Sequence, residues 1–480
     1  MTTSQASAAA QGQGRAGWSL FLIAFAHLIL TVDFTIVYVA LPKIGEELGF
    51  SQQTLQWVVH GYTVVFGGFL LLGGRASDLL GRRQVFVAAL LLFAAASLLG
   101  GFSSSSTAMV AARALQGLGA AFIFPSTLAL INTIFAEGPQ RNKAMAVWSF
   151  AGPGGLALGS LLGGVLVSAF GWEAVFLVNV PLGIAVAVGA LLVLPTDQAS
   201  SERRTFDIAG AITATLGVTL LVAVLVKAPE AGWTSPGILA SALASAALIV
   251  GFVWIERRGS NPLMPLQLLS NRNLTTAMLL TAILMSTFMA LSYFQTILFQ
   301  DVLGYGPLWT GLGFLVPCLS QAVGTQLSVP LTAHFGLRTT IVTGFAIGTL
   351  GTVGTAFGIF PDGGYIALLP GMIIGYIGHG IAFGPTWVAV TKGVEPRHHG
   401  VASAMASTSF QVGGAVGMAV LVALANGLVA VIDGGTTIAT ADGMRLSIFA
   451  AAAGIALGGL VALGLERSSS AQVAAVQPGT

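Results

Sequence analysis

Leu30-Thr-Val-Asp-Phe-Thr-Ile-Val-Tyr-Val-Ala-Leu-Pro42 closes an apolar run that begins near Trp18. The run from Trp18 to Ala40 is long enough to cross a bilayer, which takes about 20 apolar residues in a helix. Asp33 lies inside it. A charged carboxylate at membrane depth costs about 3 kcal/mol on insertion scales, so such residues are rare and face an interior. Either Asp33 is neutral or paired with a cation, or it binds and releases a proton or a cationic substrate.

The composition is that of an integral membrane protein. Of the 480 residues, 55% are hydrophobic and 8% are charged, whereas soluble domains carry about 25% charged residues. The net charge of +2 gives no reason to expect a nucleic-acid partner. The single cysteine, Cys318, excludes an intrachain disulfide. We find no phosphate-binding loop, metal-ligand cluster or nucleophile motif, so we expect neither an enzyme nor a cofactor.

Apolar runs of about twenty residues predict an all-α membrane protein with fourteen transmembrane helices. The predicted spans are residues 18–40, 54–74, 84–102, 107–134, 144–168, 174–195, 207–227, 236–255, 275–300, 309–333, 339–360, 365–390, 401–431 and 444–465. Loop arginines and lysines fall almost entirely on one side of this alternation, and only Lys43, Lys227 and Arg445 fall on the other. This asymmetry places both termini in the cytoplasm and leaves Arg113 inside a span.

A weak internal repeat indicates two halves. The segment that begins at Glu137 is similar to the one that begins at Glu395, and the loop 74–83 is faintly repeated at 330–338. Both pairs are eight spans apart, so we expect two six-helix bundles with an inserted helix pair. The predicted division is a cytoplasmic tail 1–17, an N-terminal bundle 18–206, the inserted pair 207–256, a cytoplasmic linker 257–274, a C-terminal bundle 275–466 and a cytoplasmic tail 467–480.

Three ionisable residues of the first half lie at one predicted depth. Asp33, His60 and Arg113 are each six or seven residues from the outer end of a span, which is about 10 Å. Arg113 beside Asp33 would favour the carboxylate, whereas desolvation would favour the neutral acid. Exchange between these environments is a physical way to bind and release one proton. For His60, a hydrogen-bonded interior histidine is the alternative.

Polar and aromatic side chains recur at helical spacing on the second, ninth and twelfth spans. Such stripes are costly against lipid, so they should face the interior. They serve either helix–helix hydrogen bonds or a mostly apolar cavity for an amphipathic molecule. The candidate cavity residues are Gln56, Tyr293, Gln295, Tyr376, His379 and Phe383.

Two further features concern conformational change. The cytoplasmic loop after the second span could form a salt-bridged latch, or it is ordinary positive-inside charge. Its candidate residues are Arg75, Asp78, Gly81, Arg82 and Arg83. The fifth span has a face of small residues that admits another helix closely, either as plain packing or as a seal during a conformational cycle. This face comprises Gly152, Pro153, Gly155, Gly159 and Gly163.

Several of these motifs resemble those of one family. Gly74-x-x-x-Asp78-x-x-Gly81-Arg82-Arg83 resembles the loop signature of the major facilitator superfamily. The stretch from Leu30 to Pro42 resembles the first-span signature of its fourteen-span drug:proton antiporter branch. Motifs that begin at Arg113 and Gly171 resemble those of the fourth and sixth spans. Tyr38 departs from the branch, which usually has asparagine there; Leu79 and Glu173 stand where it has basic residues.

The resemblance implies a proton-coupled antiporter that exports amphipathic drug-like or antibiotic molecules across the bacterial inner membrane by alternating access. In that branch the first-span acid and the fourth-span arginine, here Asp33 and Arg113, are assigned to proton coupling. The implied partners are the substrate, protons and membrane lipids, without nucleic acid, and the implied state is a monomer. Alternatives are an exporter of an endogenous lipid, peptide or secondary metabolite, and a non-transporting membrane sensor.

Overall fold

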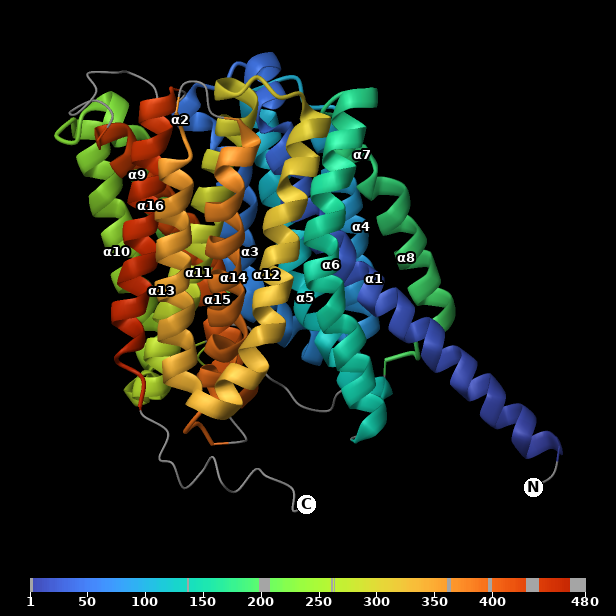
Figure 1. The fold of residues 1–480 in the computed structure, drawn as a ribbon. Helices are drawn as coiled ribbons and strands as arrows, with labels where there is room; N and C mark the ends of the chain where they lie inside the picture. Colours follow the sequence, from blue (N-terminus) through green and yellow to red (C-terminus); the bar gives the residue numbers. More distant parts are fainter. Residues whose placement is uncertain are drawn as a thin grey trace.

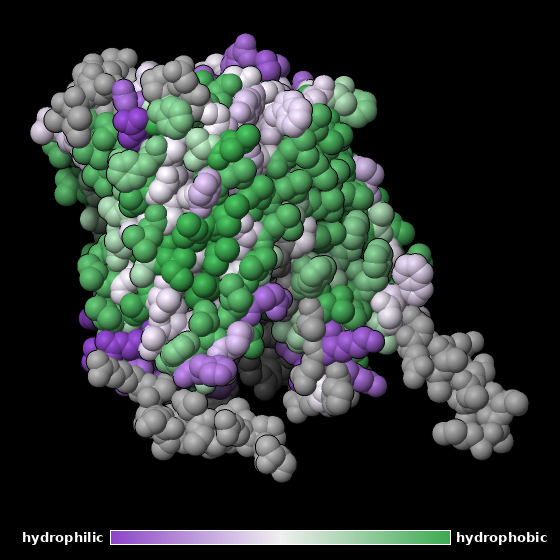
Figure 2. Space-filling view, viewed as in Figure 1, coloured by the Kyte–Doolittle hydropathy of each residue, from purple (hydrophilic) through white to green (hydrophobic). Residues whose placement is uncertain are grey.

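The computed structural model describes residues 3–135, 138–197, 208–259, 262, 264–360, 364–395, 399–428 and 440–466. Fourteen helices in these ranges are long and apolar enough to cross a membrane. Hydrophobic residues cover most of the flank of the helices, and hydrophilic residues gather at the two ends (Figure 2). The predicted all-α membrane protein with fourteen spans is therefore confirmed.

The first six spans pack mainly on one another, and we call them the N-terminal bundle. They are α1 (Thr3–Leu48), α3 (Trp57–Leu80), α4 (Arg82–Gly101), α5 (Ser106–Ile134), α6 (Pro139–Phe170), and α7 (Ala174–Leu177) with α8 (Asn179–Val193); a short α2 (Gln52–Leu55) precedes α3. Helix α1 begins within the segment that we predicted as a tail, and it continues past Pro42.

The last six spans form a second group, the C-terminal bundle. They are α11 (Arg272–Ile297) with the π-helical turn η2 (Leu298–Val302), α12 (Pro307–Phe335), α13 (Leu337–Phe357), α14 (Tyr365–Thr391), α15 (His399–Leu428) and α16 (Ala441–Ala462); a 3-10 turn η1 (Leu266–Ser270) precedes α11. The predicted tail 467–480 lies outside the described residues.

The two helices between the bundles differ in their surroundings. Helix α9 (Ile208–Ala231) packs on α3 of the first bundle and on α15 of the second. Val222 and Val226 of α9 share an apolar cluster with Val64 of α3 and Ala415 of α15. Helix α10 (Pro236–Arg258) packs mainly on α9, and most of its surface remains uncovered by protein.

Helix α1 begins and α16 ends at the same end of the molecule, which we call the base; the opposite end is the top (Figure 1). Helices α6 and α12 meet near the top and diverge toward the base (Figure 1). At their contact, Gly311 lies against the Ser160 carbonyl and Gly164 lies against Leu308. Nearby, the Gln300 side chain donates a hydrogen bond of 2.8 Å to the Val39 carbonyl. The two bundles are therefore joined at the top.

This close approach predicts that a single methyl group will open the top. In Gly311→Ala the new Cβ would overlap the Ser160 carbonyl, and overpacking of this kind costs about 1 to 3 kcal/mol. That cost shifts the balance away from the closed top at least about fivefold. The measurement is the labelling rate of Cys318, the single cysteine, by a membrane-impermeant maleimide added from each side of the membrane.

Gly306→Ala is the matched control, because a Cβ at Gly306 would meet no atom within 4 Å. We expect faster labelling from the top side only in Gly311→Ala. Equal rates in the two variants would contradict the closure.

Candidate functional site

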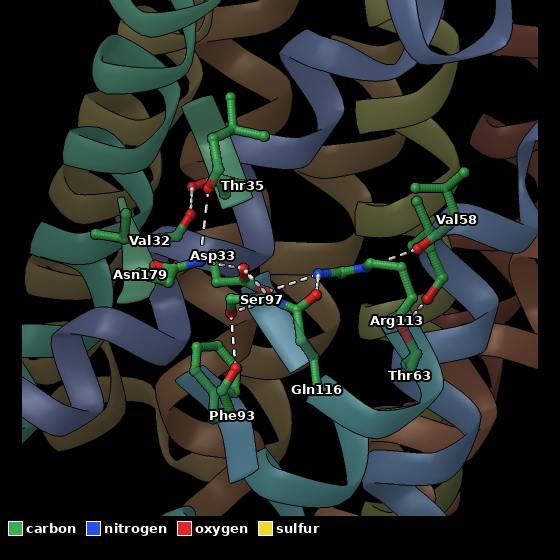
Figure 3. Close-up of polar contacts among 12 residues, drawn as sticks. Val32, Asp33, Thr35, Val58, Thr63, Phe93, Ser97, Arg113, Gln116 and Asn179 are labelled. Atoms are coloured by element: carbon green, nitrogen blue, oxygen red, sulfur yellow. Dashed lines mark hydrogen bonds and ion pairs between the residues drawn. The ribbon is translucent and has the colours of Figure 1, made fainter. Parts of the chain in front are cut away.

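Asp33 is held at the centre of a closed set of hydrogen bonds inside the N-terminal bundle (Figure 3). Its side chain is fully buried. Arg113 Nη1 of α5 lies 2.8 Å from Asp33 Oδ2. Gln116 Nε2 of α5 and Asn179 Nδ2 of α8 donate to Asp33 Oδ1, at 3.1 and 2.7 Å. Three donors from two helices therefore surround one carboxylate of α1.

Arg113 and Gln116, which donate hydrogen bonds to Asp33, form further contacts of their own. Arg113 Nε donates to the Val58 carbonyl at 2.8 Å, and its guanidinium lies over the Tyr62 ring, 4.5 Å from the centroid. Gln116 Oε1 accepts from Arg113 Nη1, and Gln116 Nε2 also donates to Ser97 Oγ of α4 at 2.7 Å. Arg113 and Gln116 thus have further partners, whereas Asn179 Oδ1 has no hydrogen-bond partner among the described residues. A buried ion pair is tolerated only when its remaining polar atoms are paired in this way.

The structure brings Asp33 and Arg113 together and places His60 elsewhere. His60 Nε2 lies 3.1 Å from Gln56 Oε1, one turn away on the same side of the bundle, and the ring is fully buried. The Gln56 side chain therefore contacts His60, and Gln56 does not line the cavity between the bundles that is described below.

Sequence reasoning missed Gln116, Asn179 and Ser97 as members of the Asp33 cluster. Gln116 carried a usable signal, because it lies three residues after Arg113 and therefore on the same helix face. Asn179 lies in the motif that begins at Gly171, but nothing in that motif points to α1, and Ser97 carried no signal; only the tertiary packing of α8 and α4 brings them to α1.

A small cavity of about 20 Å³, partly open to solvent, lies between the two bundles. Its lining residues are Thr35, Tyr38, Ser160, Phe288, Ser292, Phe314, Pro317, Cys318, Gln321 and Tyr376. Of the predicted cavity residues, only Tyr376 belongs to this lining, and Gln295 supports it by accepting the Tyr376 hydroxyl hydrogen bond at 3.0 Å.

The other predicted cavity residues lie outside that lining. Tyr293 is buried in α11. His379 and Phe383 of α14 continue a line of aromatic rings that begins at Phe288 of α11. The ring centroids of Phe288 and His379 are 5.7 Å apart, and those of His379 and Phe383 are 6.2 Å apart. Through Phe288, this line reaches the edge of the cavity.

The glycine face of α6 packs on α1 of its own bundle. Gly155 lies against Thr31, Gly159 against Thr35 and Gly163 against Ile36, while Gly152 lies near His27. The contact with the other bundle uses the adjacent Ser160 and Gly164 instead. The side chain of Pro153 lies outside the described residues.

The charged loop at the base is held in part by Asp197, which follows the sixth span. Gly81 adopts a φ of +104°, which brings the chain close to Asp197. The Asp197 carboxylate accepts hydrogen bonds of 3.0 Å from the backbone N–H groups of Arg83 and Gln84, at the start of α4. A carboxylate there also complements the positive end of the helix dipole.

The arginine side chains of this loop donate hydrogen bonds to other segments of the chain. Arg75 donates to the Pro262 carbonyl of the linker, Arg82 to Thr133 and Arg83 to the Leu191 carbonyl. The side chain of Asp78 lies outside the described residues. The predicted latch therefore includes a residue, Asp197, that the sequence did not single out.

Within the described part of the chain, no group of three or more His, Cys, Asp or Glu side chains is placed to hold a metal ion. The acidic residues that are buried in these ranges are Asp33 and Glu256. Glu256 lies near the end of α10 and accepts a hydrogen bond from the Met264 backbone at 2.9 Å. Asp33 is thus the buried acid of the two bundles.

Many apolar spans around a closed ion pair and an interior cavity define a polytopic membrane transport protein. The family model "Major Facilitator Superfamily" matches residues 23–418, so the chain belongs to that superfamily. The "Puromycin resistance protein pur8" of Streptomyces alboniger is 35% identical, over 91% of this chain and 88% of that protein. The "Tetracenomycin C resistance and export protein" of Streptomyces glaucescens is 32% identical, over 85% and 76%.

The fold is also that of solved transporters. The crystal structure of the POT family transporter PepTSo superposes with a TM-score of 0.67 at 17% identity, and the match covers 96% of this chain and 99% of that one. At this identity the likeness concerns the fold. The predicted family is confirmed, and the relatives indicate that the protein transports small molecules.

The ion pair predicts an order of stability among variants. Arg113→Gln leaves the Asp33 charge buried without its cation, and removal of one partner from a buried pair costs about 3 to 5 kcal/mol. In Asp33→Asn with Arg113→Gln neither charge remains, so the double variant should unfold at a higher temperature than Arg113→Gln alone. Thermal unfolding of the purified protein in detergent measures this. A double variant that is less stable than Arg113→Gln would show that the pairing is not what the stability depends on.

Proposed function

We propose that this protein is a proton-coupled antiporter that exports amphipathic drug-like or antibiotic molecules across the bacterial inner membrane. The observation that carries the proposal is the buried Asp33 with its three donors. It is a single ionisable site that one proton can neutralise, and it lies on a helix that also lines the cavity between the bundles. The relatives named for resistance to puromycin and for tetracenomycin C export support the substrate class.

The orientation follows from charge. Loops that are rich in lysine and arginine lie on the cytoplasmic side of membrane proteins. In this chain, the helix ends at the base carry Arg75, Arg82, Arg83 and Arg338. We therefore assign the base to the cytoplasm and the top to the outside, with both termini cytoplasmic. In this assignment the described conformation is closed toward the outside and holds Asp33 as a carboxylate.

Coupling then requires proton and substrate to favour different conformations. Protonation of Asp33 removes its charge and the acceptor strength that binds Arg113, Gln116 and Asn179. Because these donors belong to α5 and α8, their release loosens α1 from the rest of its bundle. Helix α1 also packs on α6, which makes the top contact with α12. A proton taken up from outside can thus be linked to the packing that closes the top. We take the acting unit to be a monomer.

Substitution of the carboxylate tests the proton site. Asp33→Asn keeps the size and polarity of the side chain but cannot titrate, so efflux driven by an imposed pH gradient in proteoliposomes should fall to the level of protein-free vesicles. Asp301→Asn, at an exposed position in η2, is the control and should keep wild-type efflux. Undiminished, pH-dependent efflux by Asp33→Asn would contradict the proposal.

A single carboxylate also predicts the stoichiometry. One proton exchanged for one uncharged molecule moves net charge, whereas one proton exchanged for a monovalent cation moves none. Efflux of tetracenomycin C, which is uncharged, should therefore respond to membrane potential as well as to the pH difference, and any efflux of ethidium, a permanent monocation, should respond to the pH difference alone. Flux assays with potential and pH clamped separately measure this. Equal dependence on potential for both compounds would exclude fixed one-proton exchange.

A further inference from the structure

Helix α1 presents different faces to the proton site and to the cavity. An α-helix turns about 100° per residue, so Thr35 and Tyr38 lie about 160° and 140° around the axis from Asp33. The contacts agree with this geometry: Asp33 meets α5 and α8, whereas Thr35 and Tyr38 line the cavity with residues of α6, α11, α12 and α14. A substrate in this cavity therefore does not face the carboxylate.

The cavity lining contains no Asp, Glu, His, Lys or Arg side chain. Phe288, Phe314 and Pro317 make it apolar, and its remaining polar groups are hydroxyls, the Gln321 amide and the Cys318 thiol. A charged ligand in such a site would lose its hydration without gaining a counter-ion, which is costly. An uncharged molecule with oxygen atoms would lose little hydration free energy in the same site. The lining therefore selects by hydrogen bonding and aromatic contact instead of by charge.

Most hydroxyls of the lining are already used. Thr35 Oγ1 donates to the Leu156 carbonyl at 3.1 Å, Ser160 Oγ donates to the Ala157 carbonyl at 2.9 Å, and Tyr376 donates to Gln295. Tyr38 differs, because its side chain is 2% exposed and its hydroxyl has no hydrogen-bond partner among the described residues. An unpaired buried polar group is costly, and a ligand oxygen would relieve that cost.

The rings around Tyr38 supply the apolar part of the site. Tyr38 and Phe34 meet edge to face with centroids 5.8 Å apart, and Phe34 stacks on Phe288 of the other bundle at 6.4 Å. When the two bundles part and widen this small cavity, a planar aromatic ligand can contact rings from both bundles while it reaches the Tyr38 hydroxyl. Gln321 of α12 adds an uncharged polar group from the opposite side.

We propose that Tyr38 is the hydrogen-bonding residue of a substrate site for uncharged, oxygen-bearing aromatic compounds, separate from Asp33 on the same helix. This inference rests on the proposed export function and names its substrate class. It differs from the expectation that Asp33 would offset the charge of a cationic substrate, because the structure turns Asp33 away from the cavity.

Equilibrium binding in detergent, without any gradient, tests this assignment separately from proton coupling. The probe is tetracenomycin C, an uncharged polyoxygenated aromatic. Tyr38→Phe removes only the hydroxyl, and its loss should weaken binding about three- to tenfold. In the Asp33→Asn background, Tyr38→Phe should weaken binding by the same factor as in the wild type, because the two side chains do not share the ligand. Tyr305→Phe is the matched control, because the Tyr305 hydroxyl accepts from the Tyr365 backbone and does not line the cavity.

Three outcomes would overturn the Tyr38 assignment. Wild-type affinity in Tyr38→Phe, with an unchanged unfolding temperature, would remove Tyr38 from the site. A Tyr38→Phe effect that disappears in the Asp33→Asn background would show that proton and substrate share one site. Absence of tetracenomycin C binding to the wild type would exclude the substrate class. Failure of proton-driven efflux alone would instead refute the proposed coupling and leave the Tyr38 assignment standing.

Discussion

The burial of one carboxylate constrains the whole N-terminal bundle. Asp33 is excluded from solvent, so its charge must be balanced and its oxygens must accept hydrogen bonds from protein. Arg113 supplies the balancing charge, and Gln116 and Asn179 supply the remaining donors. These requirements fix α1 against α5 and α8 at a common depth. Under the proposed coupling, one proton on Asp33 would weaken this packing of α1, because the neutral acid no longer needs a balancing charge.

The sequence could predict features that depend on local composition. The fourteen spans followed from apolar length, and the meeting of Asp33 with Arg113 followed from similar depth in the predicted helices. The family was also recognisable from motifs spread along the chain, and the matched residues 23–418 agree. In each case the signal lies within one helix or loop and does not depend on how the helices are rotated.

Rotation and tertiary contact explain what the sequence could not provide. Polar spacing on α11 and α14 indicated that Tyr293, His379 and Phe383 face the interior, yet an interior face can meet another helix as readily as a cavity. Tyr38 lines the cavity although it looked like an exception within a motif. Similarly, Asp197 reaches the start of α4 from more than a hundred residues away in the chain, at the end of the sixth span. Only the packed bundle determines these partners.

The placement of Asp33 and Tyr38 on opposite faces of α1 bears on how such proteins diversify. Substitutions on the cavity face can alter which compounds are accepted without disturbing the groups that hold the carboxylate. The energy source and the chemical repertoire can then evolve at different rates. Two relatives of similar identity to this chain are named for different compounds, one for puromycin and the other for tetracenomycin C. Under the proposed assignment, Tyr38 is a position at which substitution can change the transported compound while the residues that bind Asp33 stay the same.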